Sequence, residues 1–418
     1  MVHGGTSVDH FPTPRRGAQP GSPASCQGRH GESSRFEWSV GDDGDPAELV
    51  SAFLSGNGLP VREMGRTATQ FHPTGAGTPC GAALYVSAAA GCVMAGGPVG
   101  APSPVPGIPD VVAVVHTHRG PSESSPSVMG ACAMSTGDSG GSAGGASPDG
   151  WRLGPWRDSW SRAEHAAAVS AVRAAIGRGD VYQVNVVGHA SAPYTGDPGP
   201  ALARVAGLPG ARYGGVLSGD GWALATASPE TLVEIRGGRI ITRPIKGTRP
   251  ATAAGRAELL ASAKERAEHV MIVDLERNDL ARLGAGAVRV DELFAVRRWC
   301  GLWQAESVVS APLDQPVDLA DVLRALCPGG SVTGAPKRAA LAEIARLEPV
   351  GRGVGMGALG WVGPDHLDLG LSIRTAAVDG ERAHLWAGGG ITIDSDPLAE
   401  VEEAAAKAAP MRAALAGP

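Results

Sequence analysis

The chain has 418 residues, of which 43% are hydrophobic, and it carries a formal net charge of −6. This length suffices for one large domain or about two to three ordinary ones, each with its own core. The negative balance argues against a nucleic-acid partner, because binding to a phosphate backbone requires a surplus of Lys and Arg. A small anionic ligand is not excluded, since it needs only a local pocket of positive charge.

Six cysteines are spread along the chain without a Cys-x-x-Cys pair, so we expect neither a disulfide framework nor a structural zinc site. This usage fits a reducing compartment, and the N-terminal sequence lacks the apolar segment of a signal peptide. Residues 81–101 carry no charge, but their Ala and Gly content and Pro98 favour a strand and a loop over a membrane span. We therefore predict a cytoplasmic protein without membrane association.

The N-terminal part of the chain alternates between polar and apolar segments. Residues 1–45 are rich in Gly, Pro and Ser and are predicted to form a disordered tail. Residues 46–158 contain short apolar runs, such as "GAALYVSAAAGCVMAGG" and "DVVAVVHTH", that predict strands of an N-terminal subdomain. Within this subdomain, residues 119–150 are too polar and too rich in Gly and Ser to be buried, and they are predicted to form a linker or an inserted loop.

From residue 159 to 418 the pattern alternates between helices and groups of strands. "SRAEHAAAVSAVRAAIGRGD" has helical periodicity, and "VYQVNVVGHAS" then alternates like a strand. Residues 215–245 predict successive antiparallel strands joined at Gly-rich turns. One long helix is expected from about residue 255, followed by three more helices, with strands between the last two. Groups of strands followed by helices predict an α+β fold with antiparallel sheets, not a doubly wound fold.

Two predicted helices each carry carboxylates on one face. Glu265 and Glu268 are three residues apart on the long helix, and Glu400, Glu403 and Lys407 share a face of the last helix. Two such helices could form an oxygen-rich site for a hard divalent ion, most simply Mg²⁺. The alternative is that both faces are merely solvated.

The segment "CPGGSVTGAPKRAALAEI" predicts a helix whose start could bind an anion. Ser331 or Thr333 could cap the helix, and Pro336 suits its first turn. The glycines before it allow backbone N–H groups to approach a ligand, and such helix starts bind carboxylates. The alternative is an ordinary capped helix.

Two basic residues in otherwise apolar or rigid segments are further candidates for the site. Arg374 lies in an otherwise apolar predicted strand, "LSIRTAAV", where it is either a structural ion pair or a bidentate clamp on a carboxylate. Lys246 lies in the rigid segment "RPIKGTRP", where it is either a surface charge or a group positioned for chemistry. Together these features predict a pocket with a Mg²⁺ site and one positioned lysine, suited to a ligand with two carboxylates.

Residues 159 to about 413 resemble the chorismate-utilising enzymes, a family that includes the large subunits of anthranilate synthase and aminodeoxychorismate synthase and the isochorismate and salicylate synthases. The resemblance is carried by eight motifs in order. These are "GDVYQVN", "ASPETL", "RPIKGTRP", "AEHVMIVDLERNDLAR", "PGGSVTGAPK", "RGVGMGALG", "SIRTAAV" and "GGGITIDSDPLAEVEEAAAKA". It implies an α+β fold in which two orthogonally packed antiparallel sheets are sandwiched between helices.

The same resemblance implies roles for the acidic and basic residues. Glu268 and Glu403 are similar to Mg²⁺ ligands, with Glu265 and Glu400 near the ion, and the metal would hold the ring carboxylate of chorismate. Arg374 would hold the enolpyruvyl carboxylate. The remaining substrate contacts implied by the family are Thr333, Gly334, Gly390 and Lys407.

Two positions separate the members of the family. Aminodeoxychorismate synthases resemble this chain in having Lys246 within Pro-Ile-Lys-Gly-Thr, where the lysine attacks C2 of chorismate and ammonia then enters at C4; anthranilate synthases typically have alanine there. Glu230, in "ASPE", resembles the general acid and base of that reaction. Gln183 stands where the water-using members carry a basic lysine, which implies ammonia as the nucleophile.

The resemblance therefore predicts conversion of chorismate and ammonia to 4-amino-4-deoxychorismate, on the route to 4-aminobenzoate and folate. No cysteine lies in a Gly-x-Cys-x-Gly-x-Gln glutaminase motif, so a separate glutamine amidotransferase subunit is expected to supply ammonia. Two alternatives stay open: an anthranilate synthase or other chorismate enzyme, and a catalytically impaired chorismate-binding protein. The second is motivated by Gly355 and Gln304, which replace a tyrosine and a histidine usual in the family.

Overall fold

The computed structural model describes residues 29–65, 75–119, 150–284 and 286–417. The predicted disorder of residues 1–28 and most of the predicted inserted loop, residues 120–149, lie outside these ranges. The prediction of a tail that continues to residue 45 is wrong, because β1 (Arg29–Trp38) pairs with β3 (Val111–Arg119). Its inward side chains reach the core: Trp38 is buried, and the ring of Phe36 lies 5.5 Å from that of Phe53.

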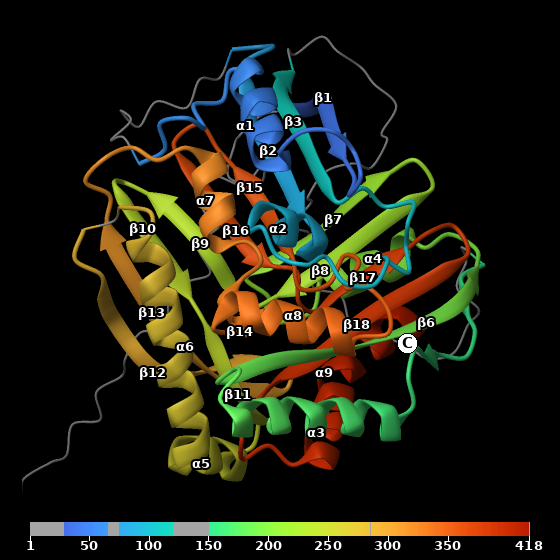
Figure 1. The fold of residues 1–418 in the computed structure, drawn as a ribbon. Coiled ribbons are helices and arrows are strands. Elements are labelled where there is room, and N and C mark those ends of the chain that lie inside the picture. The colour runs from blue at the N-terminus through green and yellow to red at the C-terminus, as the bar shows by residue number, and fades with distance from the viewer. Residues whose placement is uncertain (1–28, 66–74, 120–149, 285, 418) are drawn as a thin grey trace, which may run out of the picture.

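Two antiparallel sheets form the centre of the molecule (Figure 1). The first sheet contains, in spatial order, β1, β3, β2 (Pro79–Val86), β15 (Ala358–Val362), β16 (His366–Leu371), β9 (Thr231–Arg236), β10 (Arg239–Arg243), β13 (Leu302–Pro312) and β11 (Ile245–Pro250), with β12 (Arg289–Trp299) on β13. The second contains β14 (Gly334–Ala335), β6 (Gln183–Thr195), β18 (Arg382–Ile391), β17 (Thr375–Val378), β8 (Trp222–Ser228) and β7 (Tyr213–Gly219), with β4 (Arg152–Leu153) and β5 (Arg157–Asp158) on β6.

Helices cover these sheets and connect their strands. They are α1 (Pro46–Gly56), α2 (Ala88–Met94), α3 (Arg162–Arg178), α4 (Gly199–Ala206), α5 (Ala253–Ala261), α6 (Ala263–Ala281), α7 (Leu319–Leu326), α8 (Lys337–Leu347) and α9 (Pro397–Ala416), with a 3₁₀ turn, η2 (Gly330–Val332). The predicted α+β class is confirmed. Among the residues placed by the structure, no helix combines the length and apolar character needed to cross a membrane.

The N-terminal segment shares its sheet with the rest of the chain. Residues 46–158, predicted as a subdomain, contribute β2 and β3, and residues 82–86 of β2 pair with β15. The largest buried cluster likewise joins Val50 and Leu84 from this segment to Leu224 and Leu369 from the later strands. Both parts are therefore held together by one hydrophobic core.

Two predicted elements are each divided in the structure. The long helix breaks at Ser262, whose hydroxyl accepts a hydrogen bond from the Glu265 backbone N–H and so starts α6 as a new helix. The predicted strand "LSIRTAAV", residues 371–378, is divided between the end of β16 and β17, which belong to different sheets. Arg374 lies at this crossover with a φ of 53°, a left-handed conformation that ends the strand.

These divisions position the functional elements. α6 packs against β11 and β13, and α9 packs against β18 and α3, so the two acidic helices approach the same region from different sheets (Figure 1). The turn η2 lies between α6 and β18.

Candidate active site

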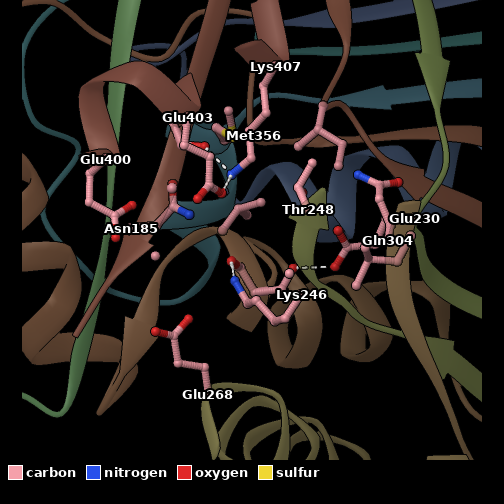
Figure 2. A pocket seen from close by; sticks show the side chains of 18 of the residues that line it. Asn185, Glu230, Lys246, Thr248, Glu268, Gln304, Met356, Glu400, Glu403 and Lys407 are labelled. Carbon is pink, nitrogen blue, oxygen red and sulfur yellow. Dashed lines mark hydrogen bonds and ion pairs between the residues drawn. The ribbon is translucent and has the colours of Figure 1, made fainter. Parts of the chain in front are cut away.

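A pocket lies where the two sheets, η2, α6 and α9 meet (Figure 2). Most of the charged and amide side chains predicted from the sequence line it. The charged, amide and hydroxyl side chains in its wall are Asn185, Glu230, Lys246, Thr248, Lys264, Glu265, Glu268, Gln304, Ser331, Arg374, Glu400, Glu403 and Lys407. Glu268 comes from α6, on the other side of the pocket from Glu400 and Glu403 of α9.

Lys246 is aimed into this pocket by an irregularity in its strand. The pairing of β11 with β13 shifts between Lys246 and Thr248, where Gly247 adopts a φ of 74°. A Cβ atom on Gly247 would lie 2.7 Å from Cδ1 of Leu259, so a glycine is required there. The Nζ of Lys246 donates a hydrogen bond of 2.8 Å to the carbonyl oxygen of Ser331. Burial lowers the pKa of Lys246, although the negative charge of Glu230 opposes that shift.

Glu230 lies in the turn between β8 and β9 and is buried. Its Oε1 accepts a hydrogen bond of 2.6 Å from the hydroxyl of Ser331. Burial raises the pKa of Glu230, although Lys246 and the bond from Ser331 oppose that rise. One residue, Ser331, therefore contacts both predicted catalytic groups through its carbonyl and its hydroxyl. The predicted helix cap at Ser331 or Thr333 is wrong: Pro336 precedes α8 without a side-chain cap, and Ser331 belongs to η2.

The four predicted metal-binding glutamates lie together, with lysines among them. Lys264 Nζ lies 3.6 Å from Oε1 of Glu268 and 3.8 Å from Oε1 of Glu400, and Lys407 Nζ lies 2.6 Å from Oε1 of Glu403. Burial raises the pKa of Glu268 and Glu400, whereas Lys407 lowers the pKa of Glu403. The fourth carboxylate, Glu265, pairs at 2.9 Å with Arg249.

The donor chemistry of this wall fits a hard divalent cation. Carboxylate oxygens from two helices face the pocket, and the Asn185 amide oxygen beside them is buried without a hydrogen-bond partner in the described part of the chain. Within the same residues, no three acidic, His or Cys side chains converge closely enough to hold a metal ion by themselves. A cation here would need further oxygen ligands, which a carboxylate-bearing substrate supplies.

Arg374 provides another positive group in the pocket wall. The residue is 8% exposed, its guanidinium lies 4.8 Å from the centre of the Trp299 ring, and its Nε has no hydrogen-bond partner among the residues described. Burial lowers the pKa of Arg374 to about 10, so the group remains charged at neutral pH. A buried guanidinium with an unused donor is suited to bind a carboxylate.

The remaining predicted contacts divide into two groups. Gly390 lines the pocket, and a Cβ atom there would lie 2.4 Å from Nε2 of Gln183 and 3.4 Å from Nζ of Lys246. Gln183 is buried directly behind it. Thr333 and Gly334 lie behind the wall: the Thr333 hydroxyl donates to the Gly329 carbonyl at 2.8 Å, and Gly334 pairs with β6.

The structure also accounts for one departure from the family pattern. A Cβ atom on Gly355 would lie 2.7 Å from Cβ of Trp386, and Trp386 itself lines the pocket. The indole therefore occupies the space that a side chain at position 355 would need. Gln304, the other departure, lines the pocket, and its amide oxygen has no hydrogen-bond partner within the described ranges.

Sequence reasoning missed a buried ion pair behind η2. Arg352 contacts Glu348 through Nε at 2.9 Å and Nη2 at 2.7 Å, and it donates to the carbonyls of Val332 at 2.5 Å and Asn185 at 2.9 Å. Glu348 in turn accepts from the Val187 backbone N–H at 3.0 Å. The pair joins two pocket-lining residues from separate elements. Its only sequence signal is the i, i+4 spacing of opposite charges after α8.

A second missed residue is Glu276 of α6. It is buried behind η2, where its Oε2 accepts a hydrogen bond of 3.3 Å from Thr242, and Lys337 pairs with neighbouring Asp279 at 2.8 Å. Burial, with the added repulsion of Asp279, raises the pKa of Glu276 to about 8. Glu276 is therefore largely protonated at neutral pH.

Comparison with known proteins identifies the class to which this fold and site belong. Residues 123–413 match the family described as chorismate binding enzyme, so the chain belongs to that family. Aminodeoxychorismate synthase component 1 of Klebsiella aerogenes is 38% identical over 256 residues, which are 59% of this chain and 57% of that protein. Anthranilate synthase component 1 of Streptomyces coelicolor is 39% identical over 269 residues, or 62% of this chain and 53% of that protein.

The matched region thus spans a little over half the length of these two relatives. Among solved structures, anthranilate synthase component I from Streptococcus pneumoniae TIGR4 superposes with a TM-score of 0.71 at 23% identity, covering 97% of this chain and 95% of that one. This similarity supports the fold. The predicted family is confirmed, while its two aminating members are similar to this chain to nearly the same degree.

The ion pair of Arg352 and Glu348 gives a first prediction. Changing Arg352→Gln leaves Glu348 buried without its partner, and we expect the free energy of unfolding to fall by about 3–5 kcal/mol. Changing Arg346→Gln, which breaks the exposed pair with Glu343 on the same helix, should cost less than about 1 kcal/mol. Urea denaturation measures both. The double change Arg352→Gln with Glu348→Gln should recover part of the loss, and equal losses for Arg352 and Arg346 would contradict the prediction.

Glu276 gives a second prediction, based on pH. Because its folded-state pKa of about 8 exceeds its ordinary value of 4.5, the folded chain binds more protons between these values, and stability falls as pH rises through that window. Glu276→Gln removes this loss, so its stability gain over the unmodified chain should grow by about 3–4 kcal/mol between pH 5 and pH 8. Asp274→Asn, an exposed change on the same helix, is the control. A gain independent of pH would refute the raised pKa.

Proposed function

We propose that this chain catalyses the amination of chorismate to 4-amino-4-deoxychorismate. The observation that carries the proposal is the pair of hydrogen bonds through Ser331, which place the Lys246 amine and the Glu230 carboxyl on one residue at the base of the pocket. A nucleophilic amine must be neutral, and an acid that assists a leaving group must be protonated. Burial moves the pKa of Lys246 down and that of Glu230 up, which favours both of these forms.

The proposed reaction proceeds in two displacements. In the first, Lys246 Nζ forms a bond to C2 of chorismate, the ring double bonds shift, and the C4–O bond breaks as Glu230 gives its proton to the departing hydroxyl, which leaves as water. In the second, ammonia forms a bond to C4 and the bond from C2 to Lys246 breaks. The new ammonium group then returns a proton to Glu230, so that the enzyme is regenerated.

In the proposal, the two carboxylates of chorismate are bound by different positive groups of the pocket. Arg374 would bind the enolpyruvyl carboxylate through its unused Nε donor. Glu268 and Glu403, with Glu265 and Glu400 close by, would hold Mg²⁺, and the ion when bound would supply positive charge that neutralises the ring carboxylate. Lys407 would contribute further positive charge near the ring.

Ammonia is the proposed second substrate. Gln183, which is buried behind Gly390, has an amide side chain with no basic group that could deprotonate water. The relatives named above are called component 1, which supports a separate partner subunit. A glutamine amidotransferase is therefore proposed to deliver ammonia to this pocket, and the product would lead to 4-aminobenzoate.

A product assay tests the proposed activity directly. Purified protein with chorismate, Mg²⁺ and ammonium at alkaline pH is expected to give 4-amino-4-deoxychorismate, detected by mass spectrometry and by conversion to 4-aminobenzoate with a lyase. The same sample is assayed for anthranilate by fluorescence. Anthranilate as the main product would replace the proposal with the anthranilate synthase alternative, and tight chorismate binding without turnover would favour the impaired binding protein.

A variant series tests the role of Lys246. Lys246→Met removes the amine at similar volume and should lower kcat at least about 10³-fold, while Glu230→Gln should lower it about 10²–10⁴-fold. Arg298→Met, an exposed change, should leave kcat unchanged. Intact-protein mass spectrometry after an acid quench should detect a chorismate-derived adduct on the unmodified protein and none on Lys246→Met. Undiminished amination at C4 by Lys246→Met would rule out covalent catalysis.

A further inference from the structure

Lys264 lies among the glutamates of α6 and α9 in the pocket wall, and it has no role in the proposed reaction. It lies in the first turn of α6, and its Nζ reaches Oε1 of Glu268 on its own helix and Oε1 of Glu400 on α9. Both oxygens are also fixed by hydroxyl donors from the connection between β18 and α9: Thr392 donates to Glu268 at 3.1 Å, and Ser395 donates to Glu400 at 2.7 Å. The ammonium group thus lies between two carboxylate oxygens that are already held in place.

The choice of lysine at this position is unusual for this chain. Only four of the 36 basic residues are lysines, and the rest are arginines. Three of the four, Lys246, Lys264 and Lys407, line this pocket, and Lys337 pairs with Asp279 behind it. Arginine binds carboxylates bidentately and holds them firmly, whereas an ammonium group is a compact charge on a flexible stem. A lysine is therefore suited to contacts that must be exchanged.

The surroundings of Lys264 allow such an exchange. Its side chain is 41% exposed, so the ammonium group can move into solvent at little cost, while the side chains of Glu268 and Glu400 are 14% and 8% exposed. Each of these buried carboxylates also lies near a second carboxylate of its own helix, Glu265 or Glu403, so a positive charge beside it is stabilising. The two neighbouring cations make their own ion pairs, because Lys407 pairs with Glu403 and Arg249 pairs with Glu265.

We propose that Lys264 is a tethered counter-ion: it joins Glu268 and Glu400 when no metal is bound and is displaced by the incoming divalent cation. The inference rests on the proposed function in that it takes Mg²⁺ as the competing ion. The lysine keeps the two helices in register and prevents the carboxylates from separating. It also weakens metal binding, because each bound Mg²⁺ must first displace the ammonium group.

Mg²⁺ titration of the purified full-length chain by isothermal calorimetry, without chorismate, tests this inference. Lys264→Met removes the competing charge at similar volume, and it should bind Mg²⁺ about tenfold more tightly than the unmodified chain. Lys264→Arg keeps the charge and should bind no more tightly. Arg298→Met is the control for loss of a remote positive charge. Equal or weaker Mg²⁺ binding by Lys264→Met would overturn the counter-ion role.

Thermal unfolding gives a second readout that does not depend on turnover. Without Mg²⁺, Lys264→Met should melt at a lower temperature than the unmodified chain, because the carboxylates then repel without compensation. On addition of saturating Mg²⁺ its melting temperature should rise by more than that of the unmodified chain. The same rise in both proteins would overturn the inference. Failure of the unmodified chain to bind Mg²⁺ both without and with chorismate would refute the proposed metal as well, whereas normal binding with a different product would refute only the proposed reaction.

Discussion

The site depends on one physical constraint: several charged groups are withdrawn from water within a single pocket. An isolated buried charge is costly unless it is paired, hydrogen-bonded or neutralised. The desolvation free energy of these charges is offset in different ways on the two sides of the pocket. Around Lys246 and Glu230, desolvation shifts both pKa values toward the neutral forms, and Ser331 supplies a hydrogen bond to each group. On the side of α6 and α9, the glutamates remain close together because lysines lie between them.

This difference follows the chemistry expected on each side. Covalent attack requires an amine without a proton and an acid with one, and burial provides both without a permanent ion pair. A metal site instead requires ionised carboxylates: burial raises the pKa of Glu268 and Glu400, and the nearby Lys264 opposes that rise. In the proposal, Lys264 supplies the positive charge beside the glutamates when no metal is bound, and Mg²⁺ supplies it when the metal is bound.

A layer of residues behind the pocket determines where Ser331 lies. Arg352 holds the carbonyl of Val332, Thr333 holds that of Gly329, and Glu276 closes the space below Gly330, where a Cβ atom would lie 3.1 Å from its Oε1. These residues occur within motifs that carry the resemblance to the family, and their contacts hold η2 in place. Thr333 and Gly334 likewise lie behind the pocket wall. Their placement limits the movement of the turn that carries Ser331.

The sequence predicted the α+β class and most of the pocket, because the helices have clear periodicity and the charged residues stand out in apolar segments. The break at Ser262 was also readable, since Ser262 and Glu265 have the spacing of a helix start within the longer helical pattern. Three features had no local signal. β1 forms from a polar segment because it pairs with β3, Arg374 turns between two sheets, and Trp386 fills the space beside Gly355. Each depends on partners distant in sequence, which periodicity and spacing cannot specify.

The distribution of lysines connects composition with mechanism. The chain uses arginine for nearly all of its positive charge, and two of its four lysines occur where the proposals require what arginine lacks. A guanidinium cannot lose its proton and so could not replace Lys246 as the proposed nucleophile. At position 264 an arginine would bind the glutamates through a planar guanidinium, and a metal ion would displace it less easily than it displaces a lysine. Arg374, by contrast, lies where a permanent charge and directional donors suit a carboxylate. In the proposals, Lys246 must lose a proton and Lys264 must release its carboxylates, whereas Arg374 must keep its charge.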